Sequence, residues 1–229
     1  MRVSPARYDG RMPATLKIDF VSDVACPWCA VGLASLQEAL RRLEGQVQAE
    51  LHFQPFELNP QMGREGQDIT EHLTQKYGST AEQQARNWEA LRQRAAAVGF
   101  EFRQEGRGRV WNTFDAHRLL HWAGTLGGDA QLRLKRALLS AYFTHARNVS
   151  DPEVLLGAAD EAGLDREEAA QVLASGQYAS EVRDQEALYT ASGIRAVPSV
   201  IVNDRHLIQG GQPPEVFEQA LRQLASQPA

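Results

Sequence analysis

Apolar and polar residues alternate in two short segments near the start of the chain. The first segment covers about residues 16–21 and the second residues 47–56, and both contain the aliphatic and aromatic residues that strands favour. Between them, leucines recur at helical spacing over about residues 26–43. A strand, a helix and a second strand in this order predict a βαβ unit, in which the two strands are parallel.

The pattern changes over about residues 68–190. This region is rich in Ala, Leu, Glu, Gln and Arg, and turn residues divide it into segments with helical periodicity. Asp151 followed by Pro152 is typical of a helix start, and Asn112 or Thr113 is a candidate cap for a helix over 114–124. Because no part of this region alternates like a strand, we predict several helices in succession.

Strand character returns at residues 197–203. The dipeptide Asn203-Asp204 is a candidate turn, after which residues 205–209 can pair back as a hairpin and lead to a closing helix. The whole order predicts one α/β sheet domain that is interrupted by a large all-helical insertion. We place these units at residues 14–62 and 193–229 for the sheet domain and 63–192 for the insertion, with residues 1–13 as a flexible N-terminal extension.

Composition and charge exclude several classes of partner. The 229 residues carry a formal net charge of −5, so the chain lacks the basic footprint of a nucleic-acid or anionic-membrane binder. No apolar run is long enough to cross a bilayer, and the basic start of the chain lacks the apolar segment of a secretory signal. We therefore expect a cytoplasmic protein. The chain contains no phosphate-binding glycine motif, so we expect no nucleotide cofactor.

The only two cysteines of the chain, Cys26 and Cys29, form a C-P-W-C motif between the first strand and the first helix. Two cysteines are too few for a framework of structural disulfides. A thiol at a helix N-terminus is close to unpaired backbone N–H groups and the positive end of the helix dipole, which stabilise a thiolate. Pro27 suits the first helical turn, and Trp28 offers an apolar contact for a substrate or simply covers the sulfurs. The motif predicts a dithiol–disulfide redox site.

The cysteine pair has two alternatives to redox chemistry. A structural zinc site normally has four ligands, and the only histidines at helical spacing are His117 and His121, which otherwise belong to an ordinary amphipathic helix. Inert core thiols are the second alternative. Redox chemistry is favoured over both, and no metal is expected. The basic stretch 103–109 is interpreted as a solvated loop.

Three motifs taken together resemble the DsbA family of thiol–disulfide oxidoreductases, and most closely its FrnE-like branch. They are residues 22–29 with Gly32, residues 112–119, and residues 197–200 followed by residues 210–217. The resemblance implies a thioredoxin-like fold with a helical insertion and an oxidoreductase or disulfide isomerase that forms a mixed disulfide with its substrate. It also implies that the Val197–Pro198 bond is cis and faces the C-P-W-C turn, where the Val197 backbone can pair with an extended substrate.

The resemblance also suggests roles for individual residues. Cys26 would attack the substrate and Cys29 would resolve the mixed disulfide. Asp19, in the strand before the motif, would be a buried acid that takes the proton from Cys29. The implied partners are protein or peptide thiols and disulfides, with glutathione or a thioredoxin-type system as candidate recycling partners. Ala196 and Gly211 depart from the family pattern, in which Gly and Ala are expected respectively.

Two functional alternatives stay open at this point. One is a glutathione-dependent isomerase or transferase of the kappa type, in which serine usually replaces the first motif cysteine and the second cysteine is not needed. The presence of Cys29 argues against it. The other is a binding or chaperone module that uses the cysteines as a redox switch.

Overall fold

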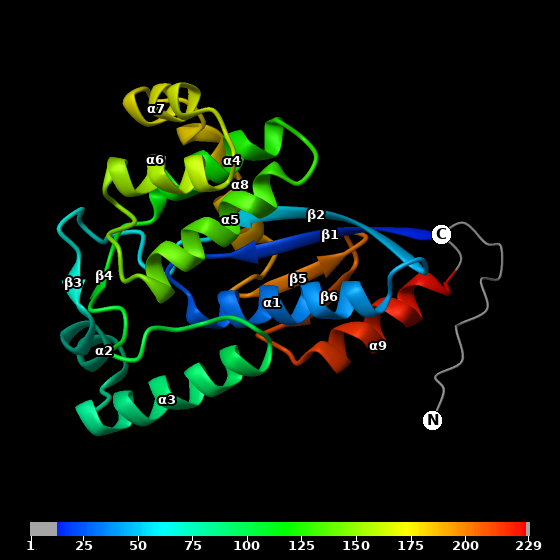
Figure 1. The fold of residues 1–229 in the computed structure, drawn as a ribbon, viewed down its shortest axis with the longest axis horizontal. Helices are drawn as coiled ribbons and strands as arrows, with labels where there is room; N and C mark the ends of the chain where they lie inside the picture. Colours follow the sequence, from blue (N-terminus) through cyan, green and yellow to red (C-terminus); the bar gives the residue numbers. More distant parts are fainter. Residues whose placement is uncertain (1–12, 228–229) are drawn as a thin grey trace.

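A four-stranded mixed sheet forms the centre of the molecule in the computed structural model, which describes residues 13–227 (Figure 1). The predicted N-terminal extension lies outside these residues except for its last position. The strands run in the order β2-β1-β5-β6, with β1 and β2 parallel and the other pairs antiparallel. Their bounds are β1 (Ala14–Ser22), β2 (Val47–Pro55), β5 (Ser199–Val202) and β6 (His206–Gln209). The predicted βαβ unit and the closing hairpin are therefore confirmed.

Two helices, α1 (Pro27–Arg42) and α9 (Pro214–Ala225), pack against each other beside the sheet (Figure 1). The central strand β1 is buried along its second half, with Ile18, Phe20 and Val21 fully inaccessible to solvent. The Asn203-Asp204 turn between β5 and β6 has positive φ at both residues, which suits the twist of a tight hairpin. These elements bring both ends of the chain into one sheet domain.

The segment between β2 and β5 is mostly helical, as predicted. Its helices are α2 (Ile69–Tyr77), α3 (Ala81–Ala97), α4 (Phe114–Thr125), α5 (Ala130–Leu139), α6 (Pro152–Glu161), α7 (Arg166–Ala174) and α8 (Ala179–Ala191), and a π-helical turn (Ser140–Thr144) continues α5. The expectation that this region contains no strand was wrong, because β3 (Gln67–Asp68) pairs with β4 (Arg109–Val110). Two-residue strands are too short to produce a visible alternation.

Side-chain caps fix where several of these helices begin. Asp151 accepts a hydrogen bond from the Glu153 amide at 3.0 Å, with Pro152 at the first helical position, as the sequence predicts. At α4, both candidate residues take part in the cap. Thr113 occupies the cap position, while the Asn112 side chain accepts the hydrogen bond from the Phe114 amide.

The insertion packs against the sheet domain over a continuous apolar core. Helices α4, α5 and α8 all contact β2, and Figure 1 shows the insertion gathered around the end of the sheet where β1 finishes and α1 begins. One buried cluster includes Phe20 of the sheet, Leu33 of α1 and Leu138 of α5. The insertion is therefore placed directly beside the C-P-W-C turn.

Candidate active site

The turn between β1 and α1 is fixed by a buried carboxylate. Asp23 accepts hydrogen bonds from the backbone amides of Ala25 at 3.1 Å and Leu58 at 2.7 Å, and its own carbonyl accepts one from the Cys26 amide at 3.2 Å. Cys26 is the N-cap residue of α1 and Pro27 is the first helical residue. The motif therefore begins a helix, as its sequence predicts.

Both cysteines are free thiols that lie beneath the surface. Cys26 is 4% exposed and Cys29 is fully buried, so Cys26 is the outer residue of the pair by a narrow margin. The Cys26 thiol donates to the carbonyl oxygen of Val197 at 3.5 Å, and the Val197–Pro198 peptide bond is cis. The structure thus brings the C-P-W-C motif and the segment that begins at Val197 together at the Cys26 sulfur.

Two glycines allow this close approach of α1 to the chain around Pro198. A Cβ atom at Gly32 would lie 3.0 Å from the Pro198 ring, and one at Gly211 would lie 2.9 Å from the Trp28 carbonyl oxygen. Contacts this short require a neighbouring atom to move. Gly211 therefore lets the chain lie directly against the backbone of Trp28.

The insertion supplies arginines to the same turn. Arg107 donates to the Ala25 carbonyl oxygen at 2.5 Å, and its guanidinium lies 5.6 Å from the centre of the Tyr142 ring. The guanidinium of Arg94, on α3, lies 5.7 Å from the centre of the Trp28 ring. The prediction of a solvated loop over 103–109 was wrong for Arg107. Its partners are distant in sequence, so the local pattern gives no sign of them.

A cluster of charged and polar residues lies buried beneath the turn. Asp23, His117 of α4 and Lys135 of α5 are each at most 3% exposed. The His117 Nε2 atom is 3.5 Å from the Asp23 carboxylate. Burial alone would raise the pKa of Asp23, but the contact with His117 and the amides of Leu58 and Ala25 outweigh burial and hold the pKa below its ordinary value. Asp23 therefore stays ionised.

Burial also acts on the thiol of Cys29. The pKa of the Cys29 thiol is raised well above its ordinary value, first by burial and then by its hydrogen bond with the Cys26 sulfur. The positive charge of Lys135 opposes this shift without cancelling it. Cys29 therefore remains a thiol at neutral pH.

The family follows from comparison with known proteins. The model of the DSBA-like thioredoxin domain family matches residues 17–222. The chain belongs to the DsbA-like thioredoxin family. It is similar to the structure of the probable DsbA oxidoreductase SCO1869 from Streptomyces coelicolor, with 36% identity, a TM-score of 0.85 and coverage of 93% of this chain and 92% of that one. The predicted family and its thioredoxin-like fold are confirmed.

The chain is also similar to two more distant proteins. The uncharacterized protein YwbO from Bacillus subtilis is 26% identical over 208 residues, which covers 90% of this chain and 96% of that protein. The structure of the cytosolic disulfide reductase DsbM from Pseudomonas aeruginosa with GSH is 17% identical, with a TM-score of 0.62 and coverage of 91% and 98%. At this identity the last comparison supports the fold alone.

Asp19, the acid that the DsbA-like resemblance suggested as a proton acceptor, is 2% exposed on β1. Its carboxylate accepts a hydrogen bond from the Gln54 side chain at 2.6 Å and lies 3.1 Å from the Lys17 ammonium. The groups that act most strongly on the Cys29 pKa are instead Cys26 and Lys135. A role of Asp19 toward Cys29 stays a prediction.

Among residues 13–227, no three His, Cys, Asp or Glu side chains gather in a way that could hold a metal ion. His117 contacts Asp23, whereas the His121 ring lies 3.4 Å from the Gln185 side chain. Over the same residues, no helix combines the length and apolarity that crossing a membrane requires.

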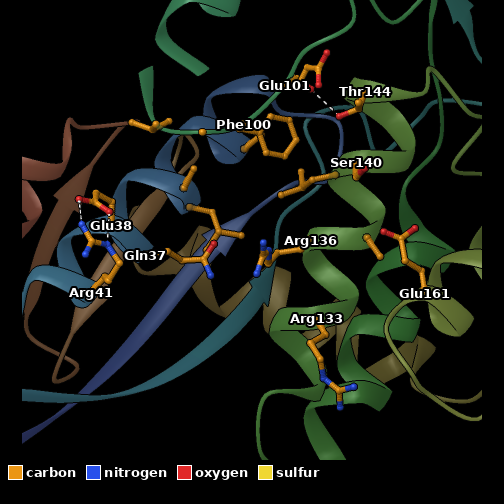
Figure 2. A pocket seen from close by; sticks show the side chains of 17 residues that line it. Gln37, Glu38, Arg41, Phe100, Glu101, Arg133, Arg136, Ser140, Thr144 and Glu161 are labelled. Atoms are coloured by element: carbon orange, nitrogen blue, oxygen red, sulfur yellow. Dashed lines mark hydrogen bonds and ion pairs between the residues drawn. The ribbon is translucent and has the colours of Figure 1, made fainter. Parts of the chain in front are cut away.

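A separate cleft of about 680 Å³ lies between α1 and α5 (Figure 2). Gln37 and Arg41 line it from α1, Arg133 and Arg136 from α5, and Phe100 lies at its edge. Neither cysteine, Val197 nor Pro198 lines this cleft. The cleft is therefore distinct from the surroundings of the two cysteines.

Proposed function

We propose that this protein catalyses dithiol–disulfide exchange with protein or peptide substrates, as an oxidoreductase or isomerase of disulfides. The observation that carries the proposal is the placement of the Cys26 sulfur, which lies at the start of α1 against the Val197 carbonyl with Cys29 one helical turn beneath it. Membership of the DsbA-like family supports the same chemistry.

The reduced protein would cleave a substrate disulfide in two steps. The Cys26 thiolate attacks one substrate sulfur, a Cys26–substrate disulfide forms, and the second substrate sulfur leaves and takes up a proton. Cys29 then loses its proton and attacks the Cys26 sulfur, so that the Cys26–Cys29 disulfide forms and the first substrate sulfur leaves as a thiolate. The reverse sequence oxidises a substrate dithiol.

The surroundings of Cys26 suit an extended substrate segment. Trp28 is 41% exposed beside the sulfur and offers apolar contact area, while Val197 is half-buried and presents its backbone to the same side. An extended peptide can pair with such a backbone, because main-chain hydrogen bonds place its sulfur without demanding a particular sequence. Pro27 and Pro198 would support this surface from either side of the sulfur.

For recycling, we propose glutathione or a thioredoxin-type reductant in the cytoplasm. The similar DsbM structure is that of a cytosolic disulfide reductase with GSH, and we extend both features of that protein to this chain as part of the proposal. Arg94 and Arg107 near the turn would favour an anionic thiol such as glutathione.

The test is turnover with protein disulfides. Insulin reduction and the reshuffling of a scrambled substrate should be measured for the wild type, for Cys26→Ser and for Cys29→Ser. We expect Cys26→Ser to abolish both activities. Cys29→Ser should lose most turnover and accumulate a stable mixed disulfide, visible by mass spectrometry, because the resolving thiol is gone.

The same assay separates the alternatives. Full glutathione-dependent activity of Cys29→Ser, with no trapped mixed disulfide, would contradict the proposal and favour a kappa-type enzyme. A wild type that binds unfolded substrates in a redox-dependent way, but turns over none of them, would favour a binding module.

A further inference from the structure

Two glutamates from distant parts of the chain bind one arginine where the sheet domain meets the insertion. Glu57 follows β2, and Glu186 lies on α8 together with Arg183. The Nη1 atom of Arg183 donates to the Oε2 atom of Glu57 and, at 2.7 Å, to the Oε2 atom of Glu186. Because one nitrogen contacts both carboxyl groups, the two acids are immediate neighbours.

The other oxygen of each glutamate is buried without a donor. The side chain of Glu57 is 1% exposed and that of Glu186 is 14% exposed. Within residues 13–227, the Oε1 atom of each receives no hydrogen bond from any donor. Leaving a buried carboxylate oxygen without a donor is costly. One guanidinium therefore does not satisfy two ionised carboxylates at this position.

A single proton supplies the missing donor. Two ionised carboxylates cannot hydrogen-bond to each other, because neither has a donor, whereas a protonated carboxyl group donates one bond. The carboxyl groups of Glu57 and Glu186 lie within hydrogen-bonding reach of each other. With one proton between them, the two acids carry one negative charge, which the guanidinium of Arg183 balances. With no proton, two negative charges face one positive charge.

The surroundings of the two acids favour the protonated form. Burial, and then the charge of Glu186, raise the pKa of Glu57. His117 of α4 and Arg183 oppose this shift without cancelling it. Burial likewise raises the pKa of Glu186 against the effect of Arg183, and the charge of Asp23 adds to the rise.

The two acids are connected to the C-P-W-C turn through one residue. Glu57 immediately precedes Leu58, whose amide donates to the Asp23 carboxylate at 2.7 Å. That carboxylate also accepts the amide of Ala25 in the turn at 3.1 Å. From α2, the Lys76 ammonium donates to the Leu58 carbonyl oxygen at 2.9 Å. The place of the Leu58 amide therefore depends on how firmly its neighbour Glu57 is held.

We propose that Glu57 and Glu186 share one proton at neutral pH. This acid pair positions the Leu58 amide so that it holds Asp23 beneath the C-P-W-C turn. The shared proton is independent of the proposed thiol–disulfide exchange. Its effect on the turn deepens that proposed function, and this half of the inference rests on it.

Loss of the shared proton at alkaline pH disrupts the acid pair. The second negative charge has no cation of its own, so the carboxylates repel each other and the buried side chain of Glu57 moves toward solvent. The Leu58 amide moves with it, and the Asp23 carboxylate loses one of its two backbone donors. Disulfide exchange that depends on a fixed turn then slows.

The shared proton can be observed in the wild type without any disulfide exchange. Glutamate labelled with ¹³C at the side-chain carboxyl reports ionisation by NMR, and signals are assigned by their loss in Glu57→Gln and Glu186→Gln. We expect the two signals to titrate together, with one proton still bound at about pH 7, because coupled acids titrate as a pair. Glu181, exposed on the same helix, is the control and should be fully ionised there. Complete ionisation of both acids at about pH 7 would overturn the inference.

Hydrogen exchange at the Leu58 amide measures the positioning effect, again without disulfide exchange. Glu57→Gln keeps a neutral side chain that can donate to Glu186, whereas Glu57→Ala removes it. We expect the Leu58 amide to lose protection about tenfold in Glu57→Ala and to stay within about twofold of the wild type in Glu57→Gln. Equal protection in Glu57→Ala and the wild type would overturn the positioning role.

The pH profile of insulin reduction tests the connection to function. The ratio of the wild-type rate to the Glu57→Gln rate cancels the titration of the cysteines, which both proteins share. We expect this ratio to be near 1 at about pH 7 and to fall about tenfold over the pH range in which NMR shows loss of the shared proton. The matched control Glu181→Gln removes the same charge from α8 and should reproduce the wild-type profile.

The outcomes separate this inference from the proposed function. A ratio that stays constant while the shared proton is lost would overturn the positioning role. If the wild type reduces no disulfide at any pH, the proposed function fails. The NMR titration and the protection of the Leu58 amide then decide the acid pair by themselves.

Discussion

At the scale of single residues, the site combines two buried thiols with a lysine whose burial is costly. Lys135 is buried without a partner among residues 13–227, whereas the neighbouring carboxylate of Asp23 is held by two amides and a histidine. Native proteins tolerate such unsatisfied groups mainly where they serve chemistry. The effect of burying Lys135 on the free energy of unfolding can be measured.

Lys135→Met should make the protein more stable at neutral pH, by about 1–4 kcal/mol, because an apolar side chain replaces a buried unpaired amine. The folded-state pKa of Lys135 lies below 10.5, so the unfolded chain binds more protons between that pKa and 10.5. The wild type therefore gains stability relative to the variant as the pH rises through this window, and the advantage of the variant shrinks.

Urea unfolding at about pH 7 and at about pH 10 measures this difference, with Arg136→Met as the control. Cys29, Tyr142 and Tyr189 also titrate in alkali, but they are present in both proteins, so the comparison concerns the difference between variants. A Lys135→Met protein that is less stable than the wild type at pH 7 would show that the amine is satisfied in solution.

The residues that could be predicted from the sequence are those whose chemistry is local. Cys26, Cys29 and Pro27 share one turn, and the family resemblance added Val197 and Pro198. Asp23, Arg107 and Lys135 were missed as site residues. Leu58 and His117, which contact Asp23, and Ala25, which contacts Arg107, lie far from those residues along the chain. The burial of Lys135 depends on tertiary packing. The sequence does contain a signal for Lys135, because this charged residue falls on the apolar face of α5 beside Leu134 and Leu138.

At the scale of elements, α1 lies close to the chain on either side of the β5–β6 hairpin. Gly32 is one residue at this contact, and its absent side chain leaves room for Pro198 and for the Gly211 backbone. Element types were predictable because the periodicity of β1, α1, β2 and α9 is strong. The β3–β4 pair was not, since two residues per strand carry no period.

Gly32→Ala should destabilise the protein by about 1–2 kcal/mol, because the overpacking penalty exceeds the gain in helix propensity. The added Cβ would lie 3.0 Å from the Pro198 ring and 3.3 Å from the Gly211 Cα, so the chain around Pro198 must shift and disulfide exchange should slow. Thermal or urea unfolding and the insulin assay measure the two effects.

Gly157→Ala is the matched control, since Gly157 also lies inside a helix but an alanine Cβ there would meet no atom within 4 Å beyond its own helix backbone. The substitution should stabilise the protein by about 0.5–1 kcal/mol and leave exchange unchanged. Equal stability of the two alanine variants would contradict the close-contact argument.

At the scale of the whole molecule, one apolar core joins the sheet domain to the insertion. Helices α4, α5 and α8 pack on β2, and the buried cluster continues from Phe20 through Leu138 to Val172 of α7. The boundaries proposed at residues 63 and 192 follow from sequence pattern alone, which records where elements change type and cannot show whether two regions share a core.

Because the core is shared, we expect the sheet domain and the insertion to unfold in one cooperative transition. Hydrogen exchange followed by mass spectrometry at increasing urea should show that peptides from β1 and from α4 and α5 lose protection with the same dependence on denaturant. Earlier loss of protection throughout the insertion would instead identify 63–192 as an independent unit.

The contact between Cys26 and Val197 spans 171 residues, a separation with a consequence for biosynthesis. At roughly 5–20 residues per second, the two thiols leave the ribosome about 10–30 seconds before the chain segment that covers them. During that interval the nascent chain displays an unshielded pair of sulfurs to any oxidant or metal nearby. A newly made molecule is therefore open to chemical damage at a place that the finished protein keeps covered.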